Sequence, residues 1–215
     1  HGPALVLLNV IERNPQAVYA CDPVLGSAQS GCFVAPEVQN LIRDRVVPRA
    51  DIISPNQFEL GFVTGTDPHT LEETLASVDL ARAMGPSTVL VTSVFQPDRP
   101  ADTVEMLAVT DDGAWLVQTP YLPEKRNGSG DVTSALFSAH LRATGDAAFA
   151  LGQTAASVFE LVENTHNAGV RELPPGIGWV LISNPDVVLE PGSIDALLAT
   201  AETDPAIGAV GPAVL

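Results

Sequence analysis

Short apolar runs alternate with amphipathic segments over most of the chain. Mostly apolar runs of strand length lie at residues 18–21, 51–54 and 88–94. Apolar residues with helical spacing predict helices at 36–47, 56–63, 70–84, 128–143 and 146–164. The run at 88–94 is uncharged and rich in β-branched residues, which is typical of a buried parallel strand. Runs at 105–110 and 114–118 flank Asp111-Asp112-Gly113 and predict a β-hairpin.

Capping residues support several of the predicted helix ends. Thr70-Leu71-Glu72-Glu73 has the capping-box spacing, in which Thr70 and Glu73 each accept a hydrogen bond from the other's main-chain N–H. Gly65 and the pair Gly85-Pro86 are placed to end two of the helices. Alternating strands and helices, with one hairpin late in the chain, indicate an α/β fold. We expect a mainly parallel sheet with helices on both faces.

Composition narrows the class of protein. The 215 residues are 46% hydrophobic and 17% charged, which is enough to form a core. A net charge of −16 disfavours binding to nucleic acid or to anionic membranes, because their phosphates are also negative. We find no run long enough to span a membrane and no basic signal-peptide flank, so we expect a soluble, cytoplasmic protein. Cys21 and Cys32 are too few for a disulfide framework, and we expect both thiols to be reduced.

A cluster of helix-breaking residues divides the chain late in the sequence. Pro174-Pro175-Gly176-Ile177-Gly178 is typical of a linker or a join between segments. We therefore expect one domain over residues 1–173 and a linker with a separate segment over 174–215. The second part contains neither Lys nor Arg. The chain begins at His1 without an initiator Met, which suggests that its numbering begins inside a larger protein.

The sequence Gly128-Ser129-Gly130-Asp131 precedes a predicted helix and has the composition of an anion-binding turn. Small residues let main-chain N–H groups approach a phosphate, and the helix N-terminus adds a positive partial charge. Asp131 could then accept the proton of a substrate hydroxyl that attacks a γ-phosphate. The alternative is that Asp131 merely caps the helix.

Two more carboxylates follow predicted strands. Asp22 comes directly after the run at 18–21, and Glu59 follows the run at 51–54. Parallel strands would bring both to the sheet edge that holds Asp131, where they could hold Mg²⁺ directly or through water. The metal would neutralise triphosphate charge that an acidic protein repels. Taken singly, each carboxylate could instead be a turn or capping residue.

Three motifs in this order resemble one known family. The segments 22–26 (Asp-Pro-Val-Leu-Gly), 54–60 (Ser-Pro-Asn-Gln-Phe-Glu-Leu) and 128–134 (Gly-Ser-Gly-Asp-Val-Thr-Ser) are similar to the C-terminal two-thirds of bacterial pyridoxal kinases, of the ribokinase-like superfamily. The resemblance spans roughly residues 6–173 and lacks the family's N-terminal part. It implies a ribokinase-like fold, a homodimer, and ATP-dependent phosphorylation of the 5′-hydroxyl of pyridoxal to pyridoxal 5′-phosphate.

The resemblance also implies roles for individual residues. Asp131 would be the base and a substrate contact, and Gly128, Ser129 and Gly130 would form the anion hole. Asp22, Ser54 and Glu59 would lie around the ATP phosphates and Mg²⁺. Thr92 lies where many members carry a nucleotide-contacting Lys, and Lys125 and Arg126 lie in the segment that covers ATP.

Other functions stay open at this point. A hydroxymethylpyrimidine kinase would share the same anion hole. The segment from Gly178 to Gly192, with residues 207–212, is similar to an internal part of family 2 glycosyltransferases, where Asp186 matches a residue at the sugar-nucleotide metal site. A third possibility is a truncated or fused chain that binds ATP without transferring phosphate.

Overall fold

The computed structural model describes residues 2–97, 99–121, 128–168 and 199. By its internal contacts the chain divides into two units, His1–Glu172 and Leu173–Leu215, and the fold described here is that of the first. The predicted site residues Lys125 and Arg126, and Asp186 in the second unit, lie outside the described residues.

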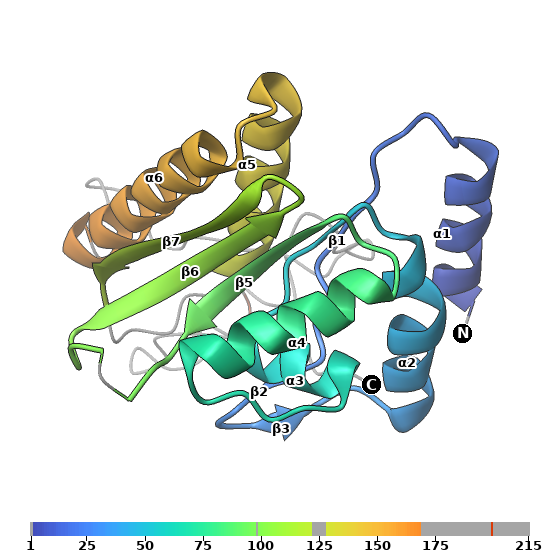
Figure 1. Cartoon of the computed structure of the whole chain (residues 1–215), viewed down its shortest axis with the longest axis horizontal. Coiled ribbons are helices and arrows are strands. Elements are labelled where there is room, and N and C mark those ends of the chain that lie inside the picture. Colours follow the sequence, from blue (N-terminus) through green and yellow to red (C-terminus); the bar gives the residue numbers. More distant parts are fainter. Residues whose placement is uncertain (1, 98, 122–127, 169–198, 200–215) are drawn as a thin grey trace. The chain divides into compact units, whose positions relative to one another are not determined.

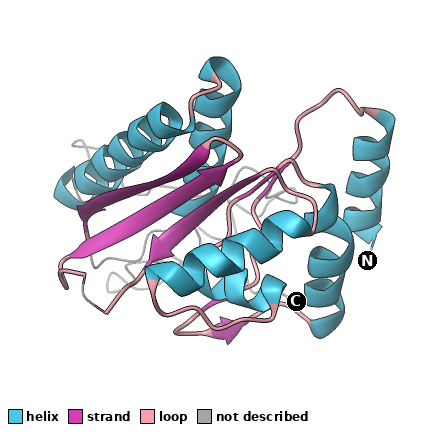
Figure 2. Ribbon diagram, viewed as in Figure 1, coloured by secondary structure: helices cyan, strands magenta, loops and turns pink. Residues whose placement is uncertain are grey.

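A five-stranded sheet with the order β1-β4-β5-β6-β7 forms the centre of the unit (Figure 2). Its parallel part consists of β1 (Ala20–Cys21), β4 (Ile52–Ile53) and β5 (Thr88–Val94). The hairpin of β6 (Thr103–Thr110) and β7 (Gly113–Pro120) adds two antiparallel strands to β5. The predicted strands and the late hairpin are confirmed, and so is the α/β fold class.

Helices cover both faces of this sheet (Figure 1). On one face lie α2 (Pro36–Leu41), α3 (Gln57–Thr64) and α4 (Leu71–Ala83). On the other lie α5 (Ser129–Thr144) and α6 (Ala147–Ala168). The helix predicted at 36–47 changes geometry along its length, since α2 continues as a π-helix over Ile42–Val46 and a 3₁₀ turn over Val47–Arg49.

Two elements differ from the sequence-based expectation. Helix α1 (Gly2–Arg13) lies where we predicted no element, because its first turn has neither acidic residues nor a clear capping signal. The Gly/Ser-rich loop after β1 contains a small antiparallel pair, β2 (Gly26–Ser27) and β3 (Gly31–Cys32). Strands of two residues are too short to leave an alternating pattern in the sequence.

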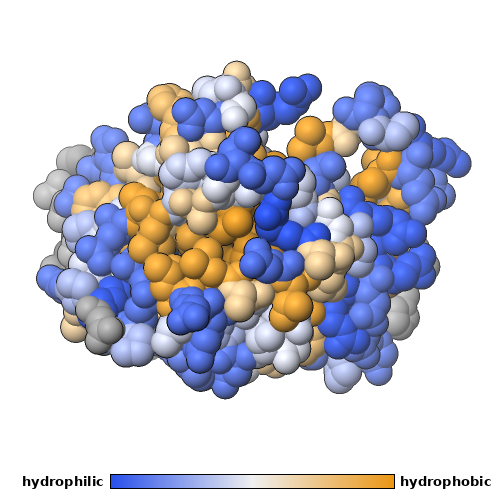
Figure 3. All heavy atoms as spheres, in the orientation of Figure 1, coloured by the Kyte–Doolittle hydropathy of each residue, from blue (hydrophilic) through white to orange (hydrophobic). Residues whose placement is uncertain are grey.

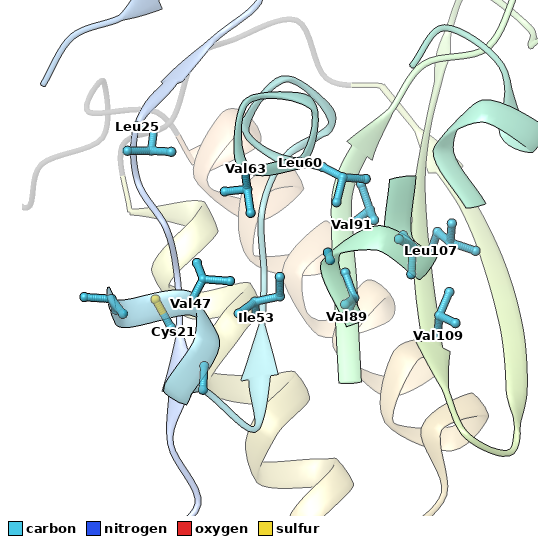
Figure 4. Packing of buried hydrophobic residues seen from close by; sticks show 14 of the residues in the cluster. Cys21, Leu25, Val47, Ile53, Leu60, Val63, Val89, Val91, Leu107 and Val109 are labelled. Carbon is cyan, nitrogen blue, oxygen red and sulfur yellow. The ribbon is translucent and has the colours of Figure 1, made fainter. Parts of the chain in front are cut away.

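Alternation along the strands divides the core into two clusters. Val89 and Val91 of β5 face α3 and α4, where they pack with residues such as Leu60 (Figure 4). Leu90, between them, faces α5 and α6 and packs with the fully buried Phe137. Successive strand residues point to opposite faces, so an uncharged strand is what a sheet covered on both faces requires.

Capping boxes stabilise the N-termini of α3 and α4. The predicted capping box of α4 is present, with Thr70 as its N-cap. Helix α3 has a second one, in which Asn56 accepts from the main chain of Glu59 and Glu59 accepts from that of Asn56. Gly65 closes α3 in the left-handed conformation at φ 72°. The start of α3 is therefore held rigidly beside the strand ends.

The face of the molecule in Figure 3 carries both apolar and hydrophilic residues. Figure 3 shows apolar residues in the middle of one face and hydrophilic residues over most of its periphery. Among the described residues, no helix has the length and apolar character needed to cross a membrane.

Cys21 is buried and Cys32 half-buried, and both thiols are free, as expected.

Candidate functional site

A cavity of about 630 Å³ lies at the carboxyl ends of β1, β4 and β5. This is where open α/β sheets place their ligands, because loops and helix N-termini converge there. Asp22 and Ser54 directly follow β1 and β4, Glu59 lies in the first turn of α3, and Thr92 lies near the end of β5; all four contribute to its wall. The start of α5 contributes Gly128, Ser129 and Gly130. Seven residues predicted from the sequence, in four separate segments of the chain, thus surround one cavity.

The turn before α5 presents main chain to this cavity. Gly128 is the N-cap of α5, with φ 85°, and it carries no side chain that could cap the helix. A Cβ built on Gly130 would lie 3.5 Å from Oδ2 of Asp22, so this carboxylate lies beside the turn. The positive end of a 16-residue helix is therefore directed at the cavity, as anion binding requires.

Asp131 lies in the first turn of α5 and is exposed. It is not the N-cap residue, because Gly128 holds that position. Asp131 does not line the cavity itself, but it directly follows Gly130, which does. Its charge is also near enough to Asp22 to raise the pKa of that residue. The carboxylate thus lies at the start of α5, next to the glycine turn.

Three carboxylates interact at this edge of the sheet. Burial, the charge of Glu59 and the charge of Asp131 together raise the pKa of Asp22 to about 7. Burial also raises the pKa of Glu59, against the opposing effect of its main-chain hydrogen bonds. Gathered negative charge of this kind favours a cation nearby, since a cation stabilises the ionised forms.

Glu59 has a structural role as well. Its Oε1 accepts hydrogen bonds from the main-chain N–H groups of Leu25 (2.9 Å) and Gly26 (3.2 Å). Its Oε2 accepts from the N–H of Asn56 at 2.9 Å. Three N–H groups occupy most of the acceptor capacity of this buried carboxylate. Glu59 therefore fixes the loop after β1, and its remaining capacity suits a contact with a metal ion through water.

Ser54 is buried, and its hydroxyl donates to Oγ of Ser134 at 2.7 Å. The bond joins the end of β4 to α5, and it directs the Ser54 hydroxyl toward the helix. Ser54 thus lines the cavity while it positions the helix that carries the glycine turn.

The oxygen donors suit Mg²⁺ in kind, because carboxylates are the hard ligands that this ion prefers. Asp22 has no side-chain hydrogen bond among the described residues, and its Oδ2 lies beside the glycine turn. Within the described ranges, no group of three or more His, Cys, Asp or Glu side chains has the geometry of a complete metal site. The arrangement fits an ion that takes further ligands from phosphate and water.

The other half of the cavity is apolar and was not predicted. It is lined by Val104 and Met106 of β6 and by a stripe on α6 that consists of Ala155, Val158, Phe159 and Val162. The apolar residues of the stripe have helical spacing, so the apolar helix face could be recognised from the sequence. The same periodicity is expected for a helix face that packs in the core, so it does not identify a cavity wall. An apolar slot beside a polar, anion-binding end suits a ligand with a planar ring and phosphates.

Ser93 was also missed. It lines the cavity next to Thr92 and has φ 55°, which is rare for a residue other than glycine. Nothing in the run Val91-Thr92-Ser93-Val94 indicates a left-handed residue.

Comparison with known proteins agrees with this geometry. Residues 4–175 match the model of a family described as phosphomethylpyrimidine kinase. Pyridoxal kinase PdxY of Leifsonia xyli is 67% identical over 172 residues, which cover 78% of this chain and 61% of that protein. The corresponding protein of Corynebacterium diphtheriae is 59% identical over 162 residues, which cover 75% of this chain and 57% of its own. The chain thus spans about 60% of the length of these curated relatives.

Solved structures share the fold. Pyridoxal kinase from Entamoeba histolytica has a TM-score of 0.67 at 21% identity, over 75% of this chain and 58% of that one. Pyridoxal kinase from Leishmania donovani in complex with ADP has a TM-score of 0.67 at 24% identity, over 77% and 58%. The family model covers most of the chain, and two relatives exceed 50% identity. This chain therefore belongs to the phosphomethylpyrimidine kinase family.

Proposed function

We propose that this chain carries the phosphoryl-transfer site of a pyridoxal kinase, which uses ATP to phosphorylate the 5′-hydroxyl of pyridoxal. The observation that carries the proposal is the convergence of Asp22, Glu59 and the Gly128–Gly130 turn on one cavity, with Asp131 beside it. The relatives from Leifsonia xyli and Corynebacterium diphtheriae are both named pyridoxal kinases.

Asp131 is the general base of this proposal. Its carboxylate accepts the proton of the pyridoxal hydroxyl, whose oxygen forms a bond to the γ-phosphorus while the bond from that phosphorus to the β–γ bridging oxygen breaks. The main-chain N–H groups at Gly128, Ser129 and Gly130 bind the transferred phosphoryl oxygens. ADP leaves, and the product is pyridoxal 5′-phosphate.

Asp22 and Glu59 would hold Mg²⁺, Asp22 directly and Glu59 through water. When bound, the ion neutralises triphosphate charge that these carboxylates would otherwise repel. Thr92, with Lys125 and Arg126 from the segment over ATP, would contact the nucleotide phosphates. The stripe on α6 would receive the base of the nucleotide, because it is apolar and adjoins the phosphate end.

A matched pair of substitutions tests the proposed base. Asp131→Asn removes the proton acceptor and should lower kcat at least about a hundredfold, as is usual for loss of a general base. Asp79→Asn on α4 is the control, since Asp79 is exposed and does not line the cavity. Formation of pyridoxal 5′-phosphate and ADP is the readout. Equal turnover of the Asp131→Asn variant and the unmodified protein would overturn the assignment.

Hydroxymethylpyrimidine is the second candidate acceptor, because the matching family is described as phosphomethylpyrimidine kinase. Comparison of kcat/KM for pyridoxal, pyridoxine, pyridoxamine and hydroxymethylpyrimidine separates the two. ATP binding without transfer to any of them would instead favour the non-catalytic chain.

Three further proposals concern the whole molecule. We infer a homodimer in the cytoplasm, which sedimentation and cell fractionation would test. We further propose that the resemblance of residues 178–192 and 207–212 to a glycosyltransferase segment reflects a sugar-nucleotide site. It predicts binding of a sugar nucleotide that weakens in Asp186→Ala, and an absence of binding by calorimetry would remove it.

A further inference from the structure

Two neighbouring hydroxyl residues at the end of β5 line the same cavity. Successive residues of a regular strand point to opposite faces, yet both Thr92 and Ser93 contribute to this wall. The pairing of β5 with β6 shifts register between Val91 and Val94, and Ser93 has φ 55°. Such a bulge allows two consecutive residues to line the same wall.

The bulge carries a conformational cost that the surrounding structure must offset. A left-handed serine is less stable than an extended one by about 1–2 kcal/mol. Before the bulge, the N–H of Thr92 donates to the carbonyl of Pro55 at 2.9 Å. After the bulge, Val94 pairs again with Glu105 of β6. The main chain of the next residue, Phe95, is held by a side chain.

That side chain is Gln57, in the first turn of α3. Its Oε1 accepts from the N–H of Phe95 at 2.9 Å, and its Nε2 donates to the carbonyl of the same residue at 3.3 Å. The amide thus takes the place of a peptide group of a neighbouring strand. Nε2 also donates to Oγ1 of Thr74 at 3.1 Å, and Thr74 is completely buried in α4. Gln57 is therefore anchored while it holds Phe95.

Asn56, which precedes Gln57, holds the loop after β1 on the other side of the cavity. Nδ2 of Asn56 donates to the carbonyl of Gly26 at 2.8 Å, in the loop that Glu59 also fixes. The first turn of α3 consequently binds the loop after β1 on one side and the end of β5 on the other. The separation of the two walls depends on these side chains.

We propose that Gln57 is a positioning residue for the nucleotide: by holding Phe95 it maintains the bulge that directs the Thr92 and Ser93 hydroxyls into the cavity. The inference rests on the proposed kinase function, because it assigns these hydroxyls to the phosphates of ATP. Without the Gln57 amide, Ser93 relaxes to the extended region and its hydroxyl turns away.

Two substitutions of similar size separate the parts of this interaction. Gln57→Met removes both hydrogen bonds to Phe95. Gln57→Glu keeps an acceptor for the Phe95 N–H but sets a second oxygen against the Phe95 carbonyl. Gln16→Met is the control, since Gln16 lies exposed in the turn after α1. All are compared in the full chain for the exchange rate of the Phe95 amide proton and for the Kd of a non-hydrolysable ATP analogue with Mg²⁺.

We expect Gln57→Met to expose the Phe95 amide to exchange and to weaken the analogue about tenfold, or about 1.4 kcal/mol. KM for ATP should rise by a similar factor while kcat stays within about twofold, since the base is untouched. Gln57→Glu should keep the amide protected and show an intermediate Kd. If the unmodified protein does not bind the analogue, the kinase proposal itself fails. If it binds, and Gln57→Met loses amide protection at unchanged Kd, the positioning role alone is wrong.

Discussion

Ser54 donates a hydrogen bond of 2.7 Å to the hydroxyl of Ser134, which lies 80 residues further along the chain. The bond joins the buried end of β4 to the helix whose first turn forms the predicted anion hole. Both elements must keep their spacing if the glycine turn is to face Asp22. The contact therefore ties the stability of the fold to the geometry of the site.

Loss of this bond should be measurable by a double-mutant cycle. Ser54→Ala and Ser134→Ala should each lower the free energy of unfolding by about 1 kcal/mol. Each substitution removes one hydroxyl and leaves the other, which is part-buried, without its hydrogen-bond partner. The double variant should lose less than the sum of the two, with a coupling energy of about 0.5–1.5 kcal/mol. Urea denaturation of the four proteins gives these values. Strict additivity would mean that the two hydroxyls do not interact.

Gly26 can be replaced by no larger residue without moving the loop after β1. A Cβ at this position would lie 2.2 Å from the carbonyl oxygen of Gly31, across the β2–β3 pair. Gly26→Ala should therefore open this pair, cost about 2 kcal/mol or more, and weaken nucleotide binding. Gly152→Ala is the control, since it lies within α6 with open space around it and should stabilise by about 0.5–1 kcal/mol. Thermal denaturation and binding of an ATP analogue measure both effects. Equal stability and equal affinity of the Gly26→Ala and Gly152→Ala variants would contradict this prediction.

The features that follow from local chemistry could be predicted from the sequence. Asp22 and Glu59 converge because each follows a parallel strand, and parallel strands end at one edge. The capping box at Thr70 and the glycine turn before α5 were also visible as short patterns. A few neighbouring residues determine the capping box and the glycine turn, whereas the meeting of Asp22 and Glu59 follows from the general geometry of parallel strands.

Contacts that depend on tertiary register could not be predicted. Gln57 reaches Phe95, 38 residues away, only once α3 and β5 lie side by side. Ser93 takes a left-handed conformation although its sequence neighbours favour an extended strand, because the surrounding structure outweighs local preference. The double hydrogen bond of Glu59 to the loop after β1 likewise needs both strands in place.

Thr154 on α6 offers a stabilising substitution. It is completely buried, and its Oγ1 has no hydrogen-bond partner among the described residues. Thr154→Val keeps the shape and removes an unsatisfied hydroxyl, so it should raise the free energy of unfolding by about 1 kcal/mol. Thr74→Val is the matched control. Thr74 is equally buried, but its hydroxyl donates to the carbonyl of Thr70 at 2.7 Å, so its loss should destabilise. Stabilisation by both variants, or by neither, would contradict the argument.

The raised pKa of Asp22 predicts a pH dependence of stability. The pKa is about 7 in the folded protein against an ordinary value of 3.8, so folding favours the protonated form. The stability that this proton provides is complete below about pH 4, declines as the pH rises, and is lost above about pH 7. Asp22→Asn cannot ionise. It should therefore gain stability over the unmodified protein between pH 5 and pH 8, by about 1–2 kcal/mol once solvent screening of the half-buried group is allowed for.

Magnesium provides the decisive comparison for this carboxylate. If Asp22 holds Mg²⁺, the ion should stabilise the unmodified protein at pH 8 and have less effect at pH 5, where the carboxyl group binds a proton instead. Asp22→Asn should respond weakly to Mg²⁺ at both values, since an amide oxygen is a poorer ligand for this ion. Thermal denaturation at the two pH values, with and without 10-fold excesses of Mg²⁺ over its apparent Kd, measures both effects. Equal Mg²⁺ responses of the two proteins at pH 8 would exclude Asp22 as a ligand and would leave its raised pKa to burial and to its neighbours Glu59 and Asp131.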